Sequence, residues 1–131
     1  MHEFSITSLL VESLLELARQ RGASRVLEVH LRIGKLRALS VDQVRFCYGI
    51  LVKGTILEGS RLFVRETQGI VRCAVCGYHG MFDSEGNSGF HFGIAGLICP
   101  RCANSLTIEG GDECVIARVR MLQPSGPSER T

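Results

Sequence analysis

The chain has no tryptophan and few aromatic residues (6%), so its core must be built mainly from leucine, valine and isoleucine. It also lacks a strong net charge: the formal charge is +2, and acidic and basic residues are spread along all 131 residues. A nucleic acid or an anionic membrane usually binds a pronounced basic surface. The composition therefore argues against both as partners.

A long uncharged apolar run is missing as well. In the first 20 residues Glu12 and Glu16 interrupt the apolar stretch, and no basic segment precedes it. The segment therefore resembles neither a signal peptide nor a membrane span. We expect a cytoplasmic location, where thiols stay reduced. The six cysteines then indicate metal ligands before they indicate disulfides.

Hydrophobic spacing predicts a small α+β fold. A helix is expected over residues 4–20, ended by Gly22, and a second over about 41–53, capped by Ser40. Alternation predicts strands over 25–34, 61–66 and 114–121, so that two helices pack on a three-stranded sheet. The expected apolar faces are Phe4, Leu10, Leu14, Leu17 and Ala18; Val44, Cys47, Tyr48 and Leu51; Leu27, Val29, Leu31 and Ile33; and Val115, Ala117, Val119 and Met121.

Glycine marks an insertion in this unit. Six glycines fall within the 22 residues between Cys76 and Cys99, too many for a segment that must build its own core. We therefore expect one domain from residues 1–70 plus 112–121 and a metal-stapled module over 71–111, resembling a zinc ribbon. Residues 122–131 lack apolar periodicity and are expected to be a disordered tail.

Two CxxC pairs are the strongest motif: Cys73 with Cys76, and Cys99 with Cys102. Such a spacing forms a turn whose two sulfurs face one ion, and two turns supply the four thiolates of a tetrahedral zinc site. Four thiolates leave no open position, so the ion would be structural. A redox dithiol or an iron–sulfur centre is the alternative, but extended sequence rather than a helix start flanks both pairs. Cys47 and Cys114 are expected to be packing residues.

The first residues suggest a second metal site. The terminal amine, the amide nitrogen of residue 2 and the His2 imidazole can close fused chelate rings around nickel(II) or copper(II), which favour planar nitrogen ligands. Alternatively, His2 is only a polar residue before a helix, with Glu3 placed favourably near the helix N-terminus. From chemistry alone this second interpretation is the commoner case.

The other histidines and aromatics favour packing over function. His30 lies on the polar face of the first strand, and His91 lies in the glycine-rich insertion. Tyr78, Phe82, Phe90 and Phe92 are expected to form a small core beside the metal, or alternatively a protein-docking patch.

Several motifs in this order resemble the HypA/HybF family of nickel metallochaperones for hydrogenase maturation. The resemblance covers residues 1 to about 121. It rests on Met1-His2-Glu3, RVLEVHLRIG at 25–34, FCYGILVKGT at 46–55, EG at 58–59, both cysteine pairs and GDE at 111–113.

The resemblance implies nickel at His2 with the adjacent backbone and with Glu3, and zinc at Cys73, Cys76, Cys99 and Cys102. The partners it implies are a HypB-type GTPase and the hydrogenase large subunit, with urease maturation proteins as alternative recipients. Some members carry an acidic residue six positions after the IG glycine; here that residue is Ser40, with Asp42 two further on. Some also have histidines beside the cysteine pairs, whereas here His79 follows Cys76 by three residues and Ala103 follows Cys102 directly.

Three function classes can be weighed. A metallochaperone that binds nickel(II) and delivers it for maturation of [NiFe] hydrogenase fits best. A zinc-ribbon module that binds nucleic acid or another protein is the alternative, although residues 73–102 hold Arg101 against Asp83 and Glu85. An enzyme is not expected, because no nucleophile triad, phosphate-binding loop or HExxH helix is present.

Overall fold

The computed structural model describes residues 2–82, 91–93, 96–124 and 126–130, and the chain divides into two compact units. The first unit comprises residues 1–32, 39–65 and 115–131, and the second comprises 33–38 and 66–114. The predicted insertion at 71–111 lies inside the second unit. That unit also takes in residues 33–38, which the sequence pattern had placed with the helices.

Helix α1 (His2–Gln20) buries a stripe of Thr7, Val11, Leu14 and Ala18. Leu14 and Ala18 were predicted, but Phe4 is 44% exposed, so its assignment to the buried stripe was wrong. Gly22 ends the helix as expected. Its φ of +64° allows the Ala23 N–H to reach the Ala18 carbonyl at 2.9 Å, in a Schellman turn. Of the helices in the described residues, none combines the length and the apolar character that crossing a membrane requires.

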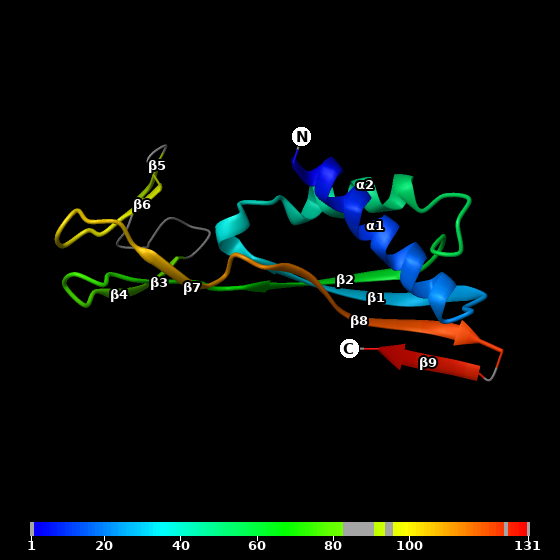
Figure 1. Cartoon of the computed structure of the whole chain (residues 1–131). Coiled ribbons are helices and arrows are strands. Elements are labelled where there is room, and N and C mark those ends of the chain that lie inside the picture. The colour runs from blue at the N-terminus through cyan, green and yellow to red at the C-terminus, as the bar shows by residue number, and fades with distance from the viewer. Residues whose placement is uncertain (1, 83–90, 94–95, 125, 131) are drawn as a thin grey trace. The chain divides into compact units, whose positions relative to one another are not determined.

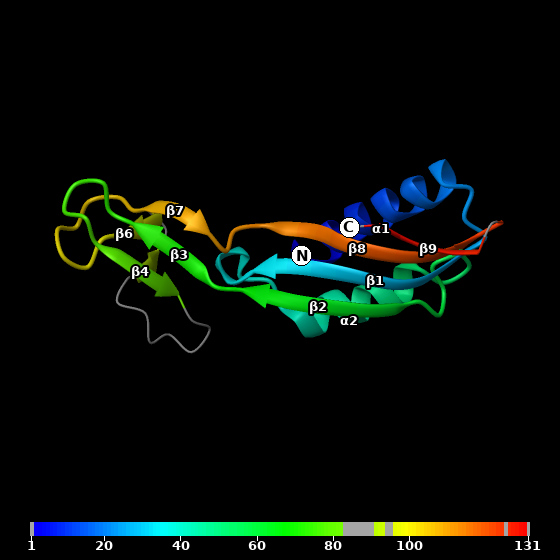
Figure 2. The ribbon, with the colours of Figure 1, turned by 90° about the horizontal axis from the view of Figure 1, so that it is seen from below.

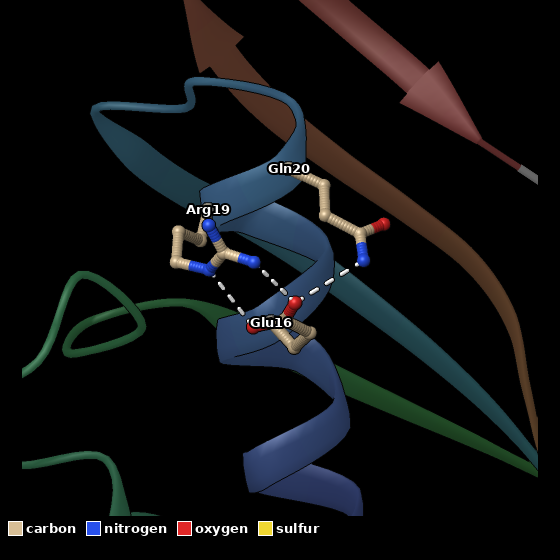
Figure 3. Close-up of polar contacts among 3 residues, drawn as sticks. All are labelled: Glu16, Arg19 and Gln20. Atoms are coloured by element: carbon tan, nitrogen blue, oxygen red, sulfur yellow. Dashed lines mark hydrogen bonds and ion pairs between the residues drawn. The ribbon is translucent and has the colours of Figure 1, made fainter.

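The solvent side of α1 near its end carries a small polar network (Figure 3). The Glu16 carboxylate accepts hydrogen bonds from the Arg19 Nε at 2.9 Å and from the Gln20 side-chain amide at 3.2 Å. The Arg19 hydrogen bond holds the pKa of Glu16 below its ordinary value. Pairs at this spacing on an exposed helix add only a few tenths of a kcal/mol, so the apolar stripe on the other side determines where the helix packs.

Helix α2 (Val41–Leu51) begins at Ser40, whose Oγ accepts the Gln43 N–H at 3.3 Å, which confirms the predicted cap. Val44, Cys47 and Tyr48 are buried as predicted. The Tyr48 hydroxyl lies 2.6 Å from the Ser60 hydroxyl, so its polar end is satisfied. Both helices lie on the same face of the sheet in the first unit (Figure 1).

The sheet has the order β2-β1-β8-β9, where β2 is Arg61–Thr67, β1 is Arg25–Gly34, β8 is Cys114–Gln123 and β9 is Gly126–Arg130. Val29 and Leu31 of β1 and Val119 and Met121 of β8 are buried, as the alternation predicted. Val115, at the start of β8, is 37% exposed and does not belong to this core. The α+β class is confirmed, with one strand more than expected.

That extra strand lies in the segment predicted to be disordered. Residues Gly126–Arg130 pair antiparallel with β8, from Gln123 opposite Gly126 to Val119 opposite Arg130. The prediction of disorder was therefore wrong for these residues. Backbone hydrogen bonds to an edge strand do not need apolar side chains, so hydrophobic periodicity gave no signal for this pairing.

The second unit holds two small antiparallel sheets. One has the order β4-β3-β7, from His79–Phe82, Gly69–Arg72 and Thr107–Gly110, and the other pairs β5 (His91–Gly93) with β6 (Gly96–Ile98). A 3₁₀ turn, η1 (Lys35–Arg37), buries Leu36 against Val71, and Tyr78 and Leu106 pack on this pair. Gly34 and Gly111 touch so closely that a Cβ on Gly34 would overlap the Gly111 carbonyl.

Candidate metal centre

Four cysteine sulfurs converge in the second unit. Cys73 and Cys76 follow β3, Cys99 and Cys102 follow β6, and the four Sγ atoms all lie within 4.8 Å of one another. Cys73 Sγ is 3.4 Å from Cys102 Sγ, and Cys76 Sγ is 3.6 Å from Cys99 Sγ. A tetrahedral ion with Zn–S bonds of about 2.3 Å would separate its sulfurs by about 3.8 Å. The donor set and its spacing therefore fit a four-coordinate zinc ion.

The two pairs form the same turn. The Cys73 N–H donates to the Tyr78 carbonyl at 2.7 Å, and the Gly77 N–H donates back to the Cys73 carbonyl at 3.0 Å. In the second pair the Cys99 N–H donates to Asn104 at 2.8 Å and the Ala103 N–H donates to Cys99 at 3.0 Å. This repetition confirms the two knuckle turns that the CxxC spacing predicted.

Each turn needs a left-handed residue directly after its second cysteine. Gly77 has φ +80° in the first turn, and Ala103 has φ +62° in the second. Glycine adopts this conformation freely, whereas alanine does so at a cost. The two turns are therefore alike in hydrogen bonding but unequal in backbone strain.

Polar groups around the sulfurs favour thiolates. The Asn104 side-chain amide donates to Cys102 Sγ at 3.2 Å, and the Arg101 N–H donates to Cys99 Sγ at 3.4 Å. The Asn104 hydrogen bond lowers the pKa of Cys102 to about 6. Cys76 goes the other way: although the Tyr78 N–H lowers its pKa, burial and the neighbouring thiols raise it to about 11. Four adjacent thiols therefore cannot all ionise without a cation among them.

Tyr78 and Arg101 join the two turns. The Tyr78 carbonyl holds the first turn, and the Arg101 guanidinium, from inside the second, lies 5.5 Å from the centre of the Tyr78 ring. Tyr78 was predicted as part of an aromatic core, and it does pack beside the cluster, on Leu36 and Val71. Phe90 and the side chains of Phe82, His91 and Phe92 lie outside the described residues. Asn104 was not predicted, because a single asparagine after a cysteine pair carries no distinctive pattern.

The remaining cysteines and His79 do not join the cluster. Cys47 is buried in α2, and Cys114 is half-buried at the start of β8, where burial raises the pKa of its thiol. His79 lies on β4 with its Nε2 3.4 Å from the Glu109 carboxylate, which also contacts Arg72 at 3.1 Å. Within the described part of the chain, the four cysteines are the one group of three or more histidine, cysteine or acidic side chains close enough to share an ion.

The predicted nickel ligands lie at the start of α1. The Glu3 carboxylate accepts the Ser40 N–H at 3.0 Å, and its carbonyl accepts the Thr7 hydroxyl at 2.5 Å. Glu3 thus links α1 to the residue that caps α2. Met1 and the side chain of His2 lie outside the described residues, so the nickel site stays a prediction.

Comparison with known proteins agrees on one family. Residues 1–121 match the family model described as hydrogenase/urease nickel incorporation, metallochaperone, hypA. A hydrogenase maturation factor HypA from Methanopyrus kandleri is 36% identical, with 95% of each chain covered. One from Methanothermobacter thermautotrophicus is 31% identical, with 92% of this chain and 97% of the relative covered.

Solved structures show the same fold. The solution structure of the nickel metallochaperone HypA from Helicobacter pylori superposes with a TM-score of 0.63 at 18% identity, covering 92% of this chain and 97% of that one. A second solution structure, of a HypA protein, gives a TM-score of 0.61 at 20% identity. At such identities the likeness concerns the fold alone.

Proposed function

The chain belongs to the HypA family of hydrogenase maturation factors, which are nickel metallochaperones and not enzymes, and we propose that it binds one nickel(II) ion at its N-terminus. The ligands are the terminal amine, backbone nitrogen and the His2 imidazole. The four cysteines hold a structural zinc ion. The protein works in the cytoplasm, in keeping with its six free cysteines.

The start of α1 supports the nickel site. The first four N–H groups of an α-helix have no carbonyl partner within the helix, and α1 begins at His2. Amide nitrogen is therefore available beside the imidazole without breaking a helical hydrogen bond. Because the Glu3 carboxylate accepts the Ser40 N–H, Glu3 contributes mainly by positioning and through its backbone. The Ser40 hydroxyl is occupied in capping α2.

The two ions are kept apart by ligand chemistry. Thiolates suit zinc in a closed tetrahedron, while deprotonated amide and imidazole nitrogens suit the planar preference of nickel(II). The zinc ion stabilises the fold of the second unit, which has only a small core of its own around Leu36 and Val71. A nickel site with few side-chain ligands can release its ion, as a chaperone must.

Release requires recipients. The proposal assigns a HypB-type GTPase as the partner in nickel handling and the hydrogenase large subunit as the destination. The family description names urease beside hydrogenase, so urease maturation proteins are the alternative recipients.

Calorimetric titration of the untagged protein with nickel tests the proposal. We expect about one nickel per chain with a Kd in the micromolar range, ~1–10 µM. His2→Ala should abolish nickel binding, because it removes the imidazole, and should leave the zinc content unchanged. His79→Ala is the matched control, since it removes an exposed imidazole elsewhere.

Two further preparations sharpen the test. A Gly-Ser extension before Met1 displaces the amine and should also abolish binding, while Glu3→Gln should keep most of it if the carboxylate is not a ligand. Unchanged nickel affinity in His2→Ala would disprove the N-terminal site.

A further inference from the structure

The sheet of the first unit has one face that no helix of that unit covers (Figure 2). Buried Val29, Leu31, Val119 and Met121 alternate along β1 and β8 with residues that point to the other side. We call this other side the basic face. Its residues, from three neighbouring strands, are Glu28, His30, Arg32, Arg61, Phe63, Arg65, Arg118 and Arg120.

Contacts at its centre hold an aromatic platform. The His30 and Phe63 rings stack with their centroids 4.6 Å apart and their planes 14° from parallel. The Arg61 guanidinium lies over the Phe63 ring, 5.5 Å from its centre. Phe63 nevertheless keeps 37% of its surface exposed. The platform is thus ordered by its neighbours and still accessible at its edge.

A hollow of about 470 Å³ opens beside this platform. His30 and Phe63 line it together with Arg32, Arg65 and Arg118. Volumes of this order accept a small ligand or a few side chains of a partner. The lining combines an apolar floor with three guanidinium groups, which bind carboxylates through paired N–H donors.

Charge on this face is strongly one-sided. Five arginines are opposed by a single carboxylate, Glu28, which already contacts His30 at 3.2 Å and Arg120 at 3.6 Å. The hydrogen bond from His30 and the charges of Arg120 and Arg61 hold the pKa of Glu28 below its ordinary value. The whole chain carries only +2, so the fold concentrates positive charge that the composition does not reveal.

We propose that the basic face binds an acidic polypeptide segment of a partner protein, with carboxylates on Arg32 and Arg65 and an apolar side chain in the hollow against Phe63. This goes beyond nickel binding and does not depend on it. Charge complementarity of this kind raises the association rate and selects the partner, while the apolar contact adds affinity.

A polypeptide is favoured over single-stranded nucleic acid by the state of Phe63. Sheet proteins that bind RNA or single-stranded DNA stack successive bases on open aromatic faces. Here His30 already stacks on Phe63 and Arg61 also lies over the ring, so no open stacking face remains for a base. An apolar side chain needs only the exposed edge and the hollow.

Fluorescence anisotropy with a labelled peptide tests this inference. The probe is a peptide of about 12 residues, in which glutamates flank one phenylalanine. We expect binding at low salt that weakens toward ~0.15 M salt, as for other charge-steered contacts. Arg32→Glu with Arg65→Glu should weaken binding at least ~10-fold. Lys53→Glu with Arg21→Glu makes the same change in net charge away from the face and should weaken it at most ~2-fold.

Further arms separate the alternatives. Phe63→Ala should remove the preference for this peptide over one with alanine in place of phenylalanine. His2→Ala should bind the peptide like the unmodified chain, so a failed nickel site and a failed basic face give different results. Absence of peptide binding at low salt, equal weakening in both double variants, or tighter binding of an oligouridine of matched charge would overturn the inference. Circular dichroism establishes that each variant is folded.

Discussion

The unequal backbone strain in the two cysteine turns makes a quantitative prediction. Gly77 and Ala103 occupy equivalent left-handed positions, with φ +80° and +62°. A left-handed L-residue costs roughly 1–2 kcal/mol, and replacing glycine by alanine recovers roughly 0.4–1 kcal/mol from the unfolded chain. A Cβ built on Gly77 meets no atom within 4 Å, so no clash adds to this balance. Gly77→Ala should therefore cost about 1 kcal/mol.

That cost should appear in zinc affinity. Because zinc binding and folding of the cysteine turns are linked, about 1 kcal/mol corresponds to about a 5-fold weaker apparent affinity. Ala103→Gly removes the same strain and should strengthen binding by about 5-fold. Competition between the reduced apoprotein and a chromophoric zinc chelator measures both changes.

A control in the other unit isolates the effect. Gly49 lies in α2, and a Cβ there also meets no atom within 4 Å, so Gly49→Ala should leave zinc affinity unchanged. If Gly77→Ala matched Gly49→Ala, or if Ala103→Gly weakened zinc binding, the assignment of strain to these two turns would be refuted.

Two other substitutions follow from the second unit. Asn104→Ala removes the donor that lowers the pKa of Cys102 to about 6, and should weaken zinc binding about 10-fold. The gap should be widest below pH 6, where zinc must displace a proton from Cys102 with or without Asn104, and should close toward pH 9, where Cys102 is a thiolate in both proteins; a gap that grows with pH would contradict this. Gly34→Ala forces a methyl group into the Gly111 carbonyl and should lower the free energy of unfolding in urea by at least ~2 kcal/mol. Gly110→Ala, whose Cβ would meet only Ile70 at 3.9 Å, is the matched control and should cost less than half as much.

Helix positions and most of the buried strand faces could be predicted because they depend on local spacing. Phe4 shows where this ends. Helix α1 is apolar on several sides, and which side is buried depends on where the sheet lies, so Phe4 is 44% exposed while Val11 is buried. Strand β9 shows a second limit, since its pairing with β8 uses backbone groups that every residue carries.

The net charge shows a third limit. Counting charges along the chain argued against a basic surface, because +2 is small. The pleat of three strands nevertheless brings Arg32, Arg65 and Arg120 to one side, while the acidic residues of the first unit lie mostly elsewhere. Charge composition constrains the total but not its distribution over the surface.

The sequence by itself determined the four sulfur ligands, because a CxxC spacing dictates the turn that aims two thiols at one ion. It also determined the two helices and the family, through motifs that are read within a few residues of one another. Only the tertiary structure decided that Asn104 donates to a sulfur, that Glu3 accepts the Ser40 N–H, and that arginines from three strands surround Phe63. These contacts join positions whose neighbourhood depends on how strands and turns come together, which no local spacing specifies.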